Sequence, residues 1–98
     1  MSVDINKDEL MAKMADNLMV LRNKLQLKQS ELAGKVGISR QTLLEIEKKR
    51  RSMSWNTFVA LLAVFREDGG TSDLLDHFGI YSAELSKFLI SPERNEDE

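Results

Sequence analysis

Apolar residues recur along most of the chain at the three- and four-residue spacing of one helix face. No stretch alternates apolar and polar residues for long enough to predict a strand. Asn6 is the candidate N-cap of a first helix, and Glu9 stands where its side chain can return a hydrogen bond to the cap. The stripe that this helix would bury consists of Leu10, Met14, Leu18, Leu21 and Leu25. The pattern predicts an all-α protein.

Two shorter helices are predicted to follow. The first runs from about Gln29 to Val36 and is stopped by Gly37, because glycine takes the positive φ of a helix C-terminus at little cost. Ser39 can cap the next helix, which is expected from about Arg40 to Lys48 or beyond. The two helices are thus separated by a tight turn.

The remaining helices are a fourth and two short ones. Ser54 is the candidate N-cap of a helix from Trp55 to Arg66. The pair Gly69-Gly70 is expected to break the chain, and short helices are expected at residues 72–78 and 82–89. We see no internal repeat.

A helix-turn-helix requires a small residue where its two helices cross, a glycine in the turn, and apolar residues that lock the helices together. Residues 29–48 meet all three requirements. Ala33 falls at the crossing and Gly37 in the turn. The locking positions are Leu32, Val36, Ile38, Leu43 and Ile46. Such a combination at the right spacing is a specific signal, whereas any one of its features alone is weak.

Residues 18–66 resemble the lambda-repressor/Cro-like, or XRE, family of DNA-binding domains. The first three helices of that family are similar to the segment LRNKLQLKQSELAGKVGISRQTLLEIEK, and its fourth helix is similar to SWNTFVALLAVF. The resemblance implies a compact four- to five-helix bundle of the lambda-repressor-like DNA-binding type, here with a short C-terminal helical extension. It also implies binding to double-stranded DNA, usually as a dimer on two half-sites, with the third helix in the major groove.

The chain departs from the family after the third helix. Members commonly have a glycine there and a proline before the fourth helix, where this chain reads Glu47-Lys48-Lys49-Arg50-Arg51-Ser52-Met53-Ser54. Either the third helix continues for another turn, or Lys49 adopts a left-handed conformation at a cost of about 1 kcal/mol.

The formal charge of −2 hides an uneven distribution. Residues 22–51 carry a net charge of +6, whereas residues 1–21 carry −2 and residues 52–98 carry −6. The nine cations of the middle segment are Arg22, Lys24, Lys28, Lys35, Arg40, Lys48, Lys49, Arg50 and Arg51. A basic middle between acidic flanks is typical of a localised phosphate-binding face.

Four side chains on the predicted outer side of the third helix are candidates for base contacts. Arg40 could pair with guanine and Gln41 with adenine, Leu44 could meet a thymine methyl, and Glu45 could accept from a cytosine amino group. Two alternatives stay open, namely that Glu45 only orients Gln41 or a nearby cation, and that Leu44 is partly buried.

Backbone contacts are expected from a second group of residues. The resemblance implies that Gln29 and the backbone N–H groups beside it hold a phosphate, as helix N-termini commonly do. The other candidates are Ser39, Thr42, Lys48, Lys49, Arg50 and Arg51. Trp55 is expected at the edge of the core, and His77 on an exposed helix without a metal or catalytic role.

Residues 74–90 contain more apolar side chains than two short helices need to cover a four-helix core. We expect a two-fold symmetric dimer through this segment. The interface candidates are Leu75, Phe78, Tyr81, Leu85, Phe88 and Leu89. The alternative is that these residues complete the core of the monomer.

The chain is therefore divided into a helix-turn-helix domain at 1–70, a C-terminal helical extension at 71–91 and a disordered acidic tail at 92–98. There is no cysteine, no apolar stretch longer than the eight residues 58–65, and no phosphate loop or nucleophile–base pair. We expect a cytoplasmic protein without enzymatic activity, cofactor, metal or membrane contact.

The function that these observations favour is sequence-specific binding of double-stranded DNA by a prokaryotic or phage transcriptional regulator, most simply a repressor. One alternative is an antitoxin-type regulator that grips a toxin through its C-terminal region. Another is a protein–protein adaptor to the transcription machinery that binds no DNA.

Overall fold

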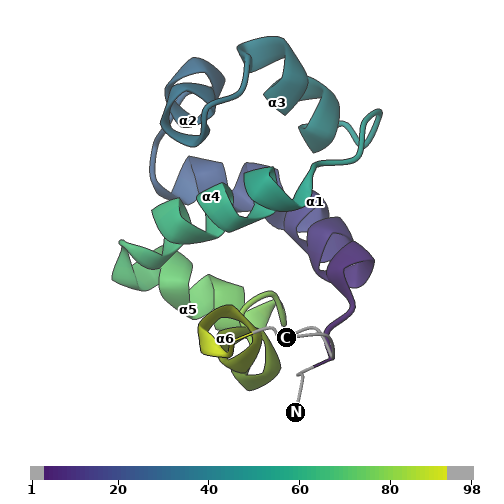
Figure 1. Cartoon of the computed structure of the whole chain (residues 1–98). Coiled ribbons are helices and arrows are strands. Elements are labelled where there is room, and N and C mark those ends of the chain that lie inside the picture. Colours follow the sequence, from purple (N-terminus) through teal and green to yellow (C-terminus); the bar gives the residue numbers. More distant parts are fainter. Residues whose placement is uncertain (1–3, 93–98) are drawn as a thin grey trace.

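The computed structural model describes residues 4–92 as six helices without a strand (Figure 1). Their bounds are α1 Lys7–Lys24, α2 Gln29–Val36, α3 Arg40–Glu47, α4 Trp55–Arg66, α5 Gly69–His77 and α6 Ala83–Ile90. The all-α prediction is confirmed. The tail was predicted to be disordered, and its residues from 93 onward lie outside the described part of the chain.

Three predicted N-caps are present. The side chains of Asn6, Ser39 and Ser54 each accept a hydrogen bond, of 3.0–3.1 Å, from the backbone N–H three residues later. The expected return bond from Glu9 to the α1 cap is replaced by another contact, because the Glu9 carboxylate lies 3.2 Å from the Lys13 ammonium, one turn further along α1. The helix starts are thus set by local side-chain chemistry.

The predicted break at Gly69-Gly70 is wrong, because both glycines lie in the first turn of α5. The N-cap is Asp68, whose carboxylate accepts from the Thr71 backbone N–H at 3.1 Å. A Cβ at Gly70 would lie 3.1 Å from the side chain of Lys24, at the end of α1. Gly70 therefore leaves room for the end of the Lys24 side chain beside the first turn of α5.

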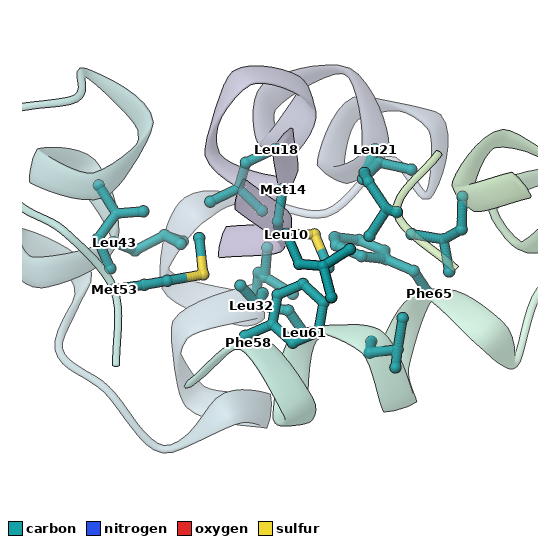
Figure 2. Close-up of a cluster of buried hydrophobic side chains, with 14 of the residues drawn as sticks. Leu10, Met14, Leu18, Leu21, Leu32, Leu43, Met53, Phe58, Leu61 and Phe65 are labelled. Carbon is teal, nitrogen blue, oxygen red and sulfur yellow. The ribbon is translucent and has the colours of Figure 1, made fainter. Parts of the chain in front are cut away.

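The core lies between α1 and α4, which cross in the middle of the molecule (Figure 1). The stripe of α1 is buried except for Leu25, which is half-buried, and it meets Phe58, Leu61 and Phe65 of α4 (Figure 2). Helices α2 and α3 lie at one end of this pair and α5 and α6 at the other. The helix-turn-helix is therefore well separated from the C-terminal extension.

Trp55 lies at the edge of the core, as expected. It is half-buried, and its ring stacks on Phe58 with 4.8 Å between ring centroids. Phe88 of α6 meets the same indole edge-on at 6.2 Å, and the Lys7 ammonium lies 5.0 Å from its centroid. Trp55 thereby joins α6 to the first turns of α1 and α4.

Candidate nucleic-acid interface

Helices α2 and α3 form the predicted helix-turn-helix. Ala33 is 2% exposed at the crossing, and Gly37 has a φ of +79° in the turn. The backbone N–H groups of Gly37 and Ile38 both donate to the Ala33 carbonyl, at 3.0 and 3.1 Å. Leu32, Leu43 and Ile46 are buried between the helices and the rest of the core. The sequence features that predicted the motif thus have the packing roles assigned to them.

Helix α3 presents one buried and one open side. Leu43, Ile46 and Glu47 face the core. The opposite side consists of Arg40, Gln41 and Lys48, which are exposed, and Leu44 and Glu45, which are half-buried. Three of the five side chains on this side are therefore open to solvent, and the other two are partly covered. The partial burial that was left open for Leu44 is what the structure shows.

The buried carboxylate of Glu47 belongs to a polar network that joins three helices. The Arg22 guanidinium of α1 donates to both carboxylate oxygens, with Nε 2.7 Å from Oε2 and Nη2 3.2 Å from Oε1. Arg22 Nη1 also donates to the Leu27 carbonyl at 2.9 Å. The Gln29 amide donates to Glu47 Oε1 at 3.2 Å. Sequence reasoning missed this network, in which Arg22 and Glu47 had counted only as charges.

The network fixes the side chain that opens α2. One amide proton of Gln29 is used by Glu47, so the side chain is held at the α2 N-terminus with its second amide proton and its carbonyl oxygen still to be used. The phosphate role that the resemblance implies for Gln29 is compatible with this orientation. The signal that could have revealed the network is Glu47 itself, a charged residue one turn after Leu43 on the core side of α3.

Helix α3 ends at Glu47, and Lys49 has a φ of +60°. The Lys49 backbone N–H donates to the Ile46 carbonyl at 3.0 Å, and the Arg50 N–H donates to the Glu45 carbonyl at 2.8 Å. These two bonds are those of a Schellman C-cap, whose left-handed residue is usually glycine. Of the two predicted paths after α3, the left-handed Lys49 is the observed one.

Two cations of the segment after α3 are engaged on the protein surface. The Lys49 ammonium lies 2.7 Å from the Asp16 carboxylate of α1. The Arg51 guanidinium lies 3.6 Å from Glu45 Oε1 and donates to the Thr42 hydroxyl at 3.4 Å. Glu45 thus has a cation beside it, Arg51, and this contact leaves the base role of Glu45 a prediction.

Only part of the positive charge of residues 22–51 is free. Three of the nine cations, Arg22, Lys49 and Arg51, form ion pairs. Within residues 4–92, six form none, namely Lys24, Lys28, Lys35, Arg40, Lys48 and Arg50. The cations that stay available near α3 lie at its start, Arg40, and at its end, Lys48 and Arg50.

Ser39 and Thr42, both expected to contact the DNA backbone, hydrogen-bond to each other. The Ser39 hydroxyl accepts from the Thr42 backbone N–H at 3.0 Å and donates to the Thr42 hydroxyl at 2.9 Å. Ser39 therefore caps α3 and uses its own hydroxyl proton on Thr42, whereas the Thr42 hydroxyl only accepts in these contacts and keeps its proton for an acceptor such as a phosphate.

The expected dimer interface is only partly at the surface. Leu75 and Leu85 are 0% exposed, because they complete the core of the monomer, and they have no surface to offer a partner. Phe78, Tyr81 and Phe88 are half-buried, and Leu89 is 39% exposed. Ile90, beside Leu89 at the end of α6, is 81% exposed.

Two further features bear on chemistry. His77 is exposed on α5, and residues 4–92 contain no group of three or more His, Cys, Asp or Glu side chains placed to hold a metal ion. In the same part of the chain, no helix has the length and apolar character needed to cross a membrane.

Comparison with known proteins gives one match. The model of a family described as helix-turn-helix matches residues 18–69, just over half of the chain. These residues run from the last third of α1 to the start of α5 and include α2, α3 and the basic segment after them. Neither the curated proteins nor the solved structures contain a match to this chain.

Proposed function

The chain belongs to the lambda-repressor/Cro-like (XRE) helix-turn-helix family of DNA-binding regulators, and on this premise we propose that it recognises a specific double-stranded DNA sequence and represses transcription by occupying it. The observation that supports this proposal is the open side of α3, on which Arg40 and Gln41 are exposed. A helix offers such side chains to base edges when it lies in the major groove.

Base reading is assigned to Arg40, Gln41, Leu44 and Glu45. The Arg40 guanidinium has no ion-pair partner among the described residues, so it can donate two parallel hydrogen bonds to guanine O6 and N7 without first breaking a contact. The Gln41 amide matches adenine N6 and N7. Both side chains lie in the first turn of α3, the part of a recognition helix that usually meets base edges.

Phosphate contacts are assigned to the two ends of the motif. At one end the α2 N-terminus presents free backbone N–H groups beside the oriented Gln29 amide. At the other end Lys48 and Arg50 are exposed cations. Phosphates bound at both ends would set the register of α3 in the groove.

We further propose that the protein binds as a homodimer through the end of α6. The apolar surface at the end of α6 consists of Leu89 and the strongly exposed Ile90. Helix α6 lies at the opposite end of the molecule from α3 (Figure 1). Light scattering at micromolar concentration tests this point. A single species of 11.2 kDa would contradict it.

The test of function is a fluorescence-anisotropy titration against random duplex at two salt concentrations, followed by selection of bound sequences from a random duplex pool. Phosphate contacts predict that log affinity falls with log salt, by roughly 0.9 per contact. The pool is expected to yield one motif, with half-site spacing and symmetry. Affinity that does not depend on salt would favour a protein–protein adaptor instead.

A further inference from the structure

Arg51 lies across one side of α3. Its guanidinium is 3.6 Å from Glu45 Oε1, and its Nη1 donates to the Thr42 hydroxyl at 3.4 Å. Thr42 and Glu45 are neighbours one turn apart on α3, so the two contacts hold the guanidinium along the helix. The side chains of Arg51 and Glu45 are 53% and 31% exposed, which leaves the pair in contact with solvent.

This contact changes what Glu45 can do beside DNA. A lone carboxylate between two rows of phosphates is repelled by them, whereas a carboxylate beside a guanidinium forms a neutral pair. A carboxylate has two oxygens and about four acceptor sites, and Arg51 approaches Oε1. Oε2 makes no hydrogen bond within residues 4–92 and is free to accept from a donor in the groove.

The chemistry of the major groove then selects the base. Only cytosine N4 and adenine N6 present amino donors there. Adenine also presents the N7 acceptor beside its amino group, and this acceptor repels a carboxylate. Guanine and thymine present acceptors at the corresponding positions. A carboxylate held at this place therefore prefers cytosine.

We propose that Arg51 is a specificity-determining positioning residue, which neutralises and orients Glu45 so that Glu45 accepts a hydrogen bond from a cytosine amino group. The inference rests on the proposed function and deepens it. It reassigns Arg51 from the phosphate contacts expected from sequence to the control of one base preference. Arg51 acts through Glu45, and its effect is confined to the base that Glu45 reads.

The experiment compares base preferences from random-pool selection for the wild type and three variants. The wild type is expected to prefer cytosine about tenfold at one position of each half-site. Arg51→Gln reduces that preference below about twofold and leaves the other positions unchanged. Glu45→Gln shifts the preference to adenine, because a glutamine amide pairs with N6 and N7. In the double variant Glu45→Gln/Arg51→Gln the adenine preference remains, since the amide carries no charge to neutralise.

Arg50→Gln is the matched control, because Arg50 is the adjacent exposed arginine and makes no ion pair within the described part of the chain. It is expected to weaken binding to all duplexes by one common factor and to leave every base preference intact. The same uniform loss for Arg51→Gln would overturn the inference and make Arg51 a phosphate contact. So would a cytosine preference that survives Glu45→Gln.

Failure of the proposed function is seen separately. In that case the wild type selects no motif and shows no salt dependence, before any variant is compared. Circular dichroism and thermal unfolding of each variant complete the comparison, and the exposure of both side chains of the pair predicts curves that match the wild type.

Discussion

Two pairs of arginine and glutamate, Arg22–Glu47 and Arg51–Glu45, lie on opposite sides of the same short helix α3. The first has side chains 12% and 0% exposed with Nε 2.7 Å from Oε2, and the second has side chains 53% and 31% exposed at 3.6 Å. Both pairs add nothing to the net charge of the motif. Their settings differ, so that the first holds the fold together and the second can be rearranged by a ligand.

The Arg22–Glu47 pair, which we call the inner pair, connects α1 to α2 and α3. Its carboxylate receives three hydrogen bonds, and its guanidinium makes a further one to the Leu27 carbonyl in the α1–α2 connection. A buried charge is tolerated when its partners are complete in this way. The network thus joins α1 to α3 and orients the Gln29 side chain at the start of α2.

The largest expected effect is the loss of one inner partner. Arg22→Met leaves the Glu47 carboxylate buried without its counter-ion, and we expect it to lower the free energy of unfolding by about 3–5 kcal/mol. Urea denaturation followed by circular dichroism measures this change. The double variant Arg22→Met/Glu47→Leu should recover most of the loss, because apolar residues often replace a buried pair without cost. If the single variant lowered the free energy of unfolding by less than about 1 kcal/mol, the pair would contribute no more than a surface ion pair does.

The next effect concerns the open side of α3. Arg40→Ala should remove the preference for one base pair, with a loss of about 1–3 kcal/mol on the selected duplex and no comparable loss on duplexes changed at that position. Stability should be unaffected, because Arg40 is exposed and makes no ion pair within residues 4–92. Anisotropy titrations against the four duplexes that differ at this base pair measure the difference.

Lys48→Ala is the control for Arg40. Lys48 is also exposed but follows the last turn of α3, where a phosphate contact is expected. Its replacement should weaken all four duplexes by the same factor and reduce the salt dependence by about one contact. An equal loss on every duplex for Arg40→Ala would remove Arg40 from the base-reading residues.

The helices were predictable where their signals are local. Asn6, Ser39 and Ser54 act on backbone N–H groups three residues away, and the predicted bounds of α2 and α4 agree with the structure. The family resemblance is confirmed by the match to residues 18–69. The start of α5 was not predicted, because two glycines in a first helical turn carry the same local signal as a break. Only Gly70 has a close neighbour, since a Cβ there would lie 3.1 Å from the Lys24 side chain, whereas a Cβ at Gly69 would have nothing within 4 Å.

Contacts distant in the sequence were not predictable from its pattern. Arg22 and Glu47 are 25 residues apart, and a count of charges treats both as free. Leu75 and Leu85 look like any other apolar residues of a short helix, and only the packing of α5 and α6 places them in the core. For the path after α3 the sequence left two possibilities, and the unusual φ of Lys49 decided between them.

The third largest expected effect is the replacement of Lys49 by glycine. A lysine at a φ of +60° occupies a conformation that glycine adopts with less strain, so Lys49→Gly should raise the free energy of unfolding by about 1 kcal/mol. For a domain of this size the midpoint of thermal unfolding should rise by about 4–8 °C. Lys49→Ala is the control, since it removes the ion pair with Asp16 but retains the strained φ. If both variants changed stability equally, the strain at Lys49 would not be the cause.

The smallest expected effect tests whether the exposed ion pair between Asp16 and Lys49 competes with DNA. The Asp16 carboxylate lies 2.7 Å from the Lys49 ammonium, and both side chains are more than half exposed. Asp16→Asn should leave stability within about 0.5 kcal/mol of the wild type. Because it frees Lys49 for phosphate, affinity for all duplexes should rise together, by less than about fivefold.

The matched control for Asp16 is Asp73→Asn, which makes the same change of charge at an exposed position of α5, away from α3 (Figure 1). Anisotropy titrations at low salt compare the two variants, since screening weakens such surface effects at higher salt. An equal rise for both variants would attribute the gain to net charge alone. A rise for Asp16→Asn only would show that the ion pair with Asp16 competes with DNA for Lys49, which is exposed, in contrast to Arg22, whose pair with Glu47 is buried.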